Sequence, residues 1–212
     1  MTEKPRSHLS VLNLSCRRGE TKLFGALSFD LGAGESLHVC GANGSGKTTL
    51  LRFLSALSFP DDGEIFWNGR SIGHALCDYR SRLAYLGHRD AIKEELTPIE
   101  NLKLAALLSG EDFDPESARG ALKRLGVPDG DAIFCRRLSQ GQKRRVALAR
   151  LSLLDRPLWI LDEPCAALDP TAAGEVASMI DAHLSSGGLA VVASPSEDAF
   201  PHARKLRLSA SC

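Results

Sequence analysis

The chain has 212 residues, and its 26 basic and 26 acidic side chains leave no net charge when histidine is neutral. Proteins that bind polyanions usually carry a basic excess, so we do not expect nucleic acid as a partner. The composition, 43% hydrophobic and 25% charged, is typical of a folded globule and excludes a disordered chain. The length suits a single domain.

Three features indicate a chain with reduced cysteines and without a membrane span or a signal peptide. The longest apolar runs, such as 158–161 and 189–193, are far too short to cross a bilayer, so we expect no direct membrane span. Residues 1–10 lack the apolar segment of a signal peptide. The cysteines are widely spaced without a C-x-x-C pattern, which favours free thiols over zinc ligands or a disulfide framework. They are Cys16, Cys40, Cys77, Cys135, Cys165 and Cys212.

Apolar periodicity alternates between strand and helix along the chain. It predicts strands at 9–14, 27–31, 36–40, 64–67 (an edge strand), 82–86, 158–161 and 189–193. It predicts helices at 49–57, 98–108, 115–125, 139–154 and 172–184. This alternation indicates an α/β fold with a parallel sheet and with ligands at the carboxyl ends of the strands. We interpret the region of about 90–140 as a small helical lobe inserted into the sheet domain.

A glycine-rich loop follows the predicted strand 36–40. Its sequence is Gly41-Ala42-Asn43-Gly44-Ser45-Gly46-Lys47-Thr48, continued by Thr49. It matches G-x-x-x-x-G-K-[ST], in which glycines let backbone N–H groups surround phosphates and the following helix adds its positive end. Lys47 is expected to reach the β- and γ-phosphates of ATP, and the Thr48 hydroxyl is expected to ligate Mg²⁺. A strand before the loop and a helix after it disfavour an accidental glycine-rich turn.

Two carboxylates end the apolar strand predicted at 158–161. Asp162 would hold Mg²⁺ through a water molecule, and Glu163 is placed to activate the attacking water as a general base. Acidic residues often end strands, so this pair alone is weak evidence for a catalytic site. Together with the phosphate loop it is strong evidence.

A second anion site is predicted where the helix 139–154 begins. The segment consists of Leu138, Ser139, Gln140, Gly141 and Gln142. Serine and glycine at a helix start offer backbone N–H groups to an anion. Ser139 is equally suited to be a plain N-cap of that helix, and it can serve both purposes.

These motifs, in this order, resemble the ATPase subunit of an ABC transporter over nearly the whole chain, from about residue 9 to 194. The resemblance implies a P-loop NTPase fold with a parallel core sheet, an antiparallel β edge and the inserted helical lobe, in one domain spanning 8–212. It implies that 138–142 is the signature motif, which contacts the γ-phosphate of ATP bound to a second copy. Active units would be head-to-tail dimers holding two ATP molecules, with the loop Ala167-Leu168-Asp169 crossing the interface.

A finer resemblance concerns the haem-exporter ATPase of bacterial cytochrome c biogenesis. It is carried by Gly87-His88, by Lys93 and by the L-T-x-x-E-N-L pattern at 96–102. It implies separate integral membrane subunits as partners and a peripheral place on the cytoplasmic face of the inner membrane. Two alternatives stay open: a soluble ABC-type ATPase acting on DNA or the ribosome, and a transporter ATPase with other cargo.

Three positions depart from the general ABC pattern. Arg18 stands where an aromatic residue stacks on adenine; its guanidinium can stack on the base or remain a solvated charge. His88 replaces the glutamine near Mg²⁺ and the attacking water, and haem ligation is a weaker reading of the same residue. Pro195 stands where a histidine contacts the γ-phosphate, and it has neither a side-chain donor nor an N–H group.

Overall fold

The computed structural model describes residues 7–127 and 131–209, which fall into two compact units. We call them the sheet unit (7–85, 156–163 and 181–209) and the helical unit (86–127, 131–155 and 164–180). The predictions for residues 1–6, for 128–130 within the lobe and for 210–212, including Cys212, lie outside the described residues. The single domain of 8–212 with a lobe at about 90–140 stays a prediction.

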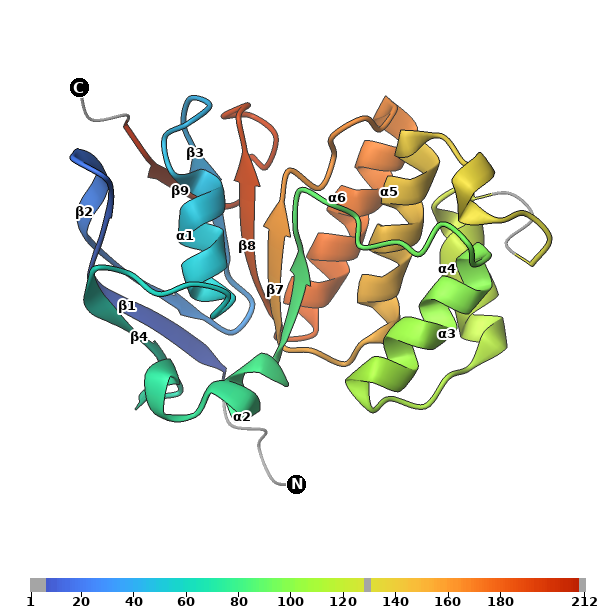
Figure 1. Cartoon of the computed structure of the whole chain (residues 1–212), viewed down its shortest axis with the longest axis horizontal. Coiled ribbons are helices and arrows are strands. Elements are labelled where there is room, and N and C mark those ends of the chain that lie inside the picture. Colours follow the sequence, from blue (N-terminus) through green and yellow to red (C-terminus); the bar gives the residue numbers. More distant parts are fainter. Residues whose placement is uncertain (1–6, 128–130, 210–212) are drawn as a thin grey trace. The chain divides into compact units, whose positions relative to one another are not determined.

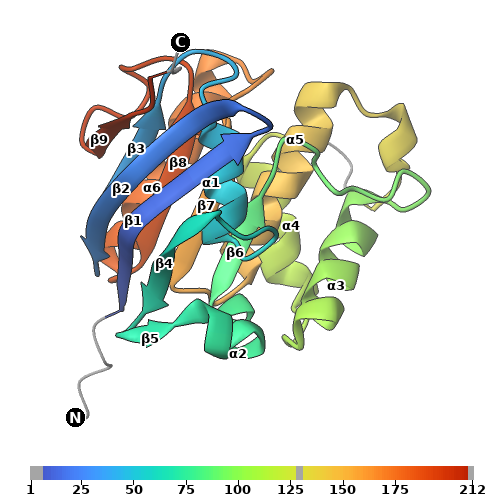
Figure 2. The same cartoon turned by 60° about the vertical axis from the view of Figure 1, so that its left-hand side comes forward.

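The sheet unit contains an antiparallel sheet with the strand order β2-β1-β4-β5, which Figure 2 shows most clearly. Its strands are β1 (His8–Arg18), β2 (Thr21–Gly32), β4 (Asp62–Trp67) and β5 (Arg70–Ser71). The prediction of an edge strand at 64–67 is wrong. Phe66 and Trp67 pair with Ser71 and Arg70 on one side, and β4 also pairs with β1. The chain turns back at Asn68-Gly69 and adds a two-residue strand that the periodicity does not reveal.

The second sheet of this unit has the order β6-β7-β8-β3-β9, and the pairs β7–β8, β8–β3 and β3–β9 are parallel. Its strands are β3 (Ser36–Cys40), β6 (Leu83–Leu86), β7 (Leu158–Asp162), β8 (Leu189–Ser194) and β9 (Arg204–Arg207). Every residue of β7 and β8 is buried. The interior position predicted for 158–161 is therefore confirmed, because strands covered on both faces are continuously apolar.

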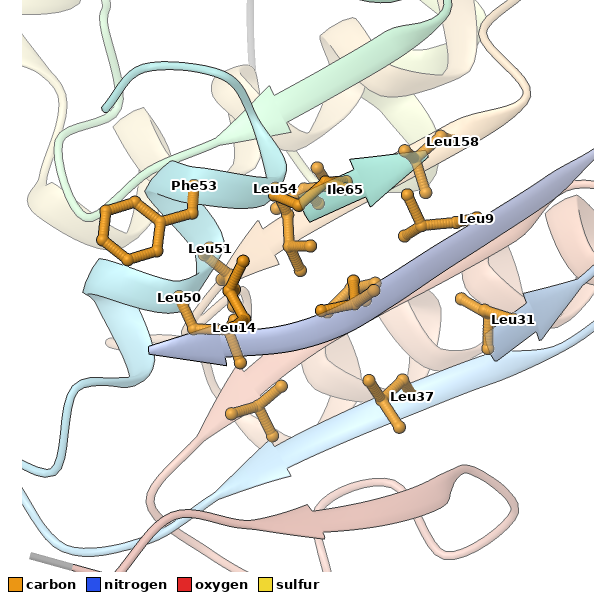
Figure 3. Packing of buried hydrophobic residues seen from close by; sticks show 14 of the residues in the cluster. Leu9, Leu14, Leu31, Leu37, Leu50, Leu51, Phe53, Leu54, Ile65 and Leu158 are labelled. Atoms are coloured by element: carbon orange, nitrogen blue, oxygen red, sulfur yellow. The ribbon is translucent and has the colours of Figure 1, made fainter. Parts of the chain in front are cut away.

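Helix α1 (Lys47–Leu54) is anchored in the core of the sheet unit. Figure 3 shows Leu50, Leu51 and Leu54 of this helix among buried residues that include Leu14 of β1 and Leu37 of β3. Burying a leucine side chain contributes about 1.5–3 kcal/mol. This packing fixes the helix, and with it the loop that immediately precedes it. The short segments η1 (Ile72–His74) and α2 (Leu76–Arg80) were not predicted.

The helical unit is built around three packed helices, α3, α4 and α5, which Figure 1 shows together. It contains α3 (Pro98–Ser109), α4 (Pro115–Arg124), η2 (Cys135–Arg137), α5 (Gln140–Ala149) and η3 (Arg150–Leu153). Both α3 and α4 begin with proline after a side-chain N-cap, Thr97 and Asp114 respectively, as helix starts favour. The predicted helix 139–154 is instead α5 followed by a 3₁₀ segment.

Helix α6 (Pro170–Ser185) begins in the helical unit and ends in the sheet unit. Among the described residues, no helix has both the length and the apolar character that a bilayer span requires. The five cysteines in the described part of the chain are free thiols.

Candidate nucleotide site

The glycine-rich loop connects β3 to the first turn of α1. Gly46 is the N-cap of α1, with φ 96° and no side-chain cap. The first hydrogen bond of the helix runs from the Leu50 N–H group to the Gly46 carbonyl at 2.8 Å. The N–H groups of Lys47, Thr48 and Thr49 precede it at the positive end of the helix, where an anion is favoured.

Two glycines of the loop lie close to residues that are distant in the sequence. A Cβ atom at Gly41, where φ is 150°, would lie 2.3 Å from the carbonyl oxygen of Leu208. A Cβ atom at Gly46 would lie 3.0 Å from Phe24. Phe24 is itself buried and stacks edge-on against Phe53 of α1. Neither Leu208 nor Phe24 was predicted to lie beside the loop, because neither residue belongs to the motif.

The charged and hydroxyl groups of the loop point inward. Lys47 is 6% exposed, and its Nζ atom donates to the carbonyls of Gly41 at 2.8 Å and Ala42 at 3.0 Å. Ser45 is buried, and its Oγ atom has no hydrogen-bond partner in the structure. A buried hydroxyl without a partner is costly, and a phosphate oxygen would satisfy it. Ala42, Asn43 and Gly44 form the exposed tip. This donor set fits a nucleotide.

The two predicted magnesium ligands meet within the sheet unit. The Thr48 hydroxyl donates to Oδ2 of Asp162 at 2.9 Å. Asp162 is 1% exposed and ends β7, whereas Thr48 lies in the first turn of α1. An oxygen-only pair beside a phosphate loop fits the hard cation Mg²⁺.

Glu163 follows Asp162 in an unusual backbone conformation. Its φ is 48°, which is uncommon for a residue other than glycine, and the following Pro164 disfavours the right-handed helical alternative. The Glu163 N–H group donates to the Ala193 carbonyl at 2.9 Å, which ties this turn to the end of β8. Pro195 follows β8 directly and is exposed. The structure thus places the predicted base and the departure from the histidine pattern at the ends of adjacent strands.

Arg18 is exposed at the end of β1, where it pairs with Thr21 in the β1–β2 hairpin. Its stacking on adenine stays a prediction. Thr49 is half-buried in the first turn of α1.

In the helical unit, the segment 138–142 begins α5 with a capping box. The Ser139 hydroxyl accepts from the Gln142 N–H group at 3.2 Å, and the Gln142 side chain accepts from the Ser139 N–H group at 2.9 Å. Leu138 is buried, whereas Ser139 and Gln140 are exposed. The N-cap interpretation of Ser139 is therefore confirmed, and its contact with a phosphate stays a prediction.

The predicted dimer loop lies against this helix. A Cβ atom at Gly141 would be 2.6 Å from the Ala167 carbonyl oxygen. The Arg145 guanidinium forms an ion pair with Asp169, whose other oxygen accepts from the Ala172 N–H group at 2.9 Å. The Ala172 hydrogen bond and Arg145 together hold the pKa of Asp169 below its usual value. His88 is exposed in the loop that follows β6.

Comparison with known proteins agrees with this geometry. The family model of the ABC transporter matches residues 24–166. The cytochrome c biogenesis ATP-binding export protein CcmA of Dechloromonas aromatica is 50% identical over 94% of this chain and 99% of its own length. The protein of the same name from Nitrosomonas europaea is 47% identical over 91% of each chain.

Solved structures confirm the predicted fold. An ABC transporter ATP-binding protein from Pyrococcus furiosus is 26% identical and superposes with a TM-score of 0.84, covering 95% of this chain and 97% of its own. A dimeric bacterial ABC transporter cassette, 21% identical, has the same TM-score of 0.84 over 95% of this chain and 94% of its own. The chain therefore belongs to the ABC transporter family of ATP-binding proteins, in the group of the cytochrome c biogenesis ATP-binding export proteins.

Proposed function

We propose that this chain is the ATP-hydrolysing subunit of a membrane ABC complex that serves haem export and cytochrome c maturation. The observation that carries the ATPase assignment is the hydrogen bond between Thr48 and Asp162, which joins the phosphate loop to the acidic end of β7. The names of the close relatives, cytochrome c biogenesis ATP-binding export proteins, support the choice of pathway.

The nucleotide is held mainly by the loop from Gly41 to Thr49. Backbone N–H groups at the start of α1 and the Ser45 hydroxyl bind phosphate oxygens. Lys47 turns from the carbonyls of Gly41 and Ala42 to the β- and γ-phosphates, which are better acceptors because they are charged. Arg18 stacks on the adenine ring.

Hydrolysis needs a base, a polar contact and a metal. Glu163 takes the proton from the attacking water. His88, as a neutral imidazole, accepts or donates a hydrogen bond near that water. The Thr48 hydroxyl and Asp162, the latter through water, hold Mg²⁺, which when bound neutralises charge developing on the phosphate oxygens.

A second copy of the chain completes the site. The segment 138–142 of one copy contacts the γ-phosphate of ATP held by the other, and Asp169 lies in the loop that crosses the interface. ATP binding then draws the two copies together, and hydrolysis releases them. Separate integral membrane subunits convert this cycle into work, which places the chain peripherally on the cytoplasmic face of the bacterial inner membrane.

Deletion of the gene, followed by complementation, tests this function. We expect the deletion strain to lose haem-containing c-type cytochromes, seen by haem staining of membrane proteins. The unaltered chain should restore them, and Lys47→Ala should not. Normal cytochrome c in the deletion strain would contradict the proposed pathway. Isolation of the native complex would then decide between another cargo, if membrane subunits co-purify, and a soluble ATPase, if DNA or ribosomes do.

A further inference from the structure

Within the helical unit, a buried ion pair joins the loop 87–90, called here the His88 loop, to helix α5, which begins in the signature segment 138–142. One nitrogen of Arg144, Nη1, donates to Oδ1 of Asp90 at 2.8 Å and to the Gly87 carbonyl at 2.8 Å. The two side chains are only 5% and 6% exposed. Arg144 thus holds both the beginning and the end of the segment 87–90, in which His88 lies.

The second oxygen of Asp90 is also used by the same helix. Oδ2 accepts from Nε2 of Gln140 at 2.8 Å. Residues 140 and 144 are four apart in α5 and therefore share one face. A single carboxylate consequently links the loop to two successive turns of α5, one of which lies in the signature segment.

The next residues of α5 make contacts of other kinds. Lys143 pairs with Glu94 at 2.5 Å, with side chains 16% and 56% exposed. Arg145 pairs with Asp169 of the predicted dimer loop. In each of these two pairs the carboxylate is about half exposed, so solvent screens the attraction. A pair with both partners buried is costly to break. Of these three ion pairs of α5, the Asp90–Arg144 pair is therefore the one that should cost most free energy to break.

We propose that Asp90 and Arg144 are positioning residues of the ATPase: their buried pair, together with Gln140, holds the His88 loop and the signature segment in one fixed geometry. The inference rests on the proposed function. Neither residue needs to touch the nucleotide. His88 serves the ATP of its own copy and the signature segment serves the ATP of the partner copy, so the pair couples the two sites of the dimer.

The test uses the full chain isolated with the membrane subunits that co-purify with it. Asp90→Asn keeps the size of the side chain and removes its charge. Arg144→Gln removes the guanidinium, and the double variant completes a mutant cycle. We expect each single change to lower kcat about 10- to 100-fold, as misplacement of catalytic groups does. We expect the ATP Kd to stay within about twofold, because the phosphate loop is untouched. The double variant should be no slower than the slower single variant.

Two readouts separate positioning from a merely structural role. The Hill coefficient for ATP should fall toward one if the pair couples two sites. Rates are measured well below each variant's unfolding temperature and divided by the folded fraction from circular dichroism. A pair that only stabilises the fold would lower the unfolding temperature while leaving this corrected kcat and the Hill coefficient unchanged. If Arg144→Gln fails to fold, the milder Asp90→Asn carries the test alone.

Glu94→Gln and Lys143→Met are the matched controls, since they break the half-exposed pair of the same helix and should leave kcat unchanged. Wild-type kcat in Asp90→Asn, or an equal loss in the controls, would overturn the inference while the unaltered chain still hydrolyses ATP. Absence of ATPase activity in the unaltered complex would overturn the proposed function, and this inference with it.

Discussion

Helices α1 and α5 both begin at a motif proposed to contact ATP, yet the N–H groups of their first turns are capped differently. The N-cap of α1 is Gly46, which has no side chain to offer. The N-cap of α5 is Ser139, and its capping box with Gln142 supplies hydrogen-bond partners at both residues. The first helix start has no side-chain cap, whereas the second already has side-chain partners for the N–H groups of Ser139 and Gln142.

This difference indicates an order of events in the proposed cycle. The start of α1 adds the Ser45 hydroxyl and Lys47 to its open N–H groups, so it should bind ATP without a second copy. At the start of α5 the Ser139 hydroxyl accepts the capping hydrogen bond, so its O–H group stays available to a phosphate while the Gln142 N–H group is already occupied. It should therefore be the weaker site, effective only when the partner copy brings ATP to it. The predictions below test this division, beginning with the largest expected effect.

Glu163→Gln should stop the cycle after ATP has bound at the start of α1 and has contacted the start of α5 of the partner copy. An amide cannot take a proton from water, and loss of a general base typically costs about 10²- to 10⁴-fold in rate. ATP should still bind, and the protein should accumulate as a dimer, measured by sizing chromatography with and without ATP. Glu175→Gln, an exposed change on α6, is the control. A variant that stays monomeric in ATP and hydrolyses ATP at the normal rate would contradict both the role of Glu163 as the base and the site shared by two copies.

Lys47→Ala should weaken binding at the open helix start. Hydrogen bonds to charged groups contribute about 1.5–3 kcal/mol each, so the ATP Kd should rise about 10- to 100-fold. Isothermal titration of the single chain measures it. Lys205→Ala removes a lysine from β9 of the same unit, where it pairs only at 3.8 Å with Asp198, and should leave Kd unchanged. An unaltered Kd in Lys47→Ala would mean that the loop is not the phosphate site.

The sequence predicted those parts of the molecule whose signals are local. The glycine-rich loop has glycines and a lysine at fixed spacing, and β7 is continuously apolar, so the positions of both in the fold were predicted correctly. Strand β9 was missed because Arg204–Arg207 is polar and mostly exposed, and only its pairing with β3 makes it a strand.

Contacts between distant residues escaped prediction for the same reason. Asp90 and Arg144 are 54 positions apart, and each looks like an ordinary surface charge in the sequence. Phe24 meets Gly46 only once β2 lies beside the loop. The 3₁₀ segment after Ala149 breaks a helical pattern that continues in the sequence, because tertiary packing overrides local periodicity.

Two substitutions at Ser139 separate its cap from its contact with the partner's ATP. Asp is as good an N-cap as Ser, so Ser139→Asp should leave the unfolding temperature nearly unchanged. Its negative charge, however, should repel a phosphate and abolish ATP-dependent dimerisation. Ser139→Ala loses the cap as well, which costs about 1 kcal/mol of stability. ATP-dependent dimers of Ser139→Asp, seen by light scattering, would show that the start of α5 meets no phosphate.

Pro195→His is expected to have the smallest effect. It tests whether the ATP site at the start of α1 lacks a contact with the γ-phosphate. Pro195 is exposed directly after β8, beside the turn that carries Glu163, so a histidine there finds space and adds a donor. Removing a long-established donor of this kind costs about 2.7–4 kcal/mol. A new one in an unoptimised site should return only part of that, as a rise of a few fold in kcat with KM unchanged, which marks a contact made in the transition state. Loss of proline frees the unfolded chain and should cost about 0.4–1 kcal/mol, a small shift in thermal unfolding. A stable variant whose kcat does not rise would show that Glu163 and His88 suffice, and that Pro195 only shapes the turn after β8.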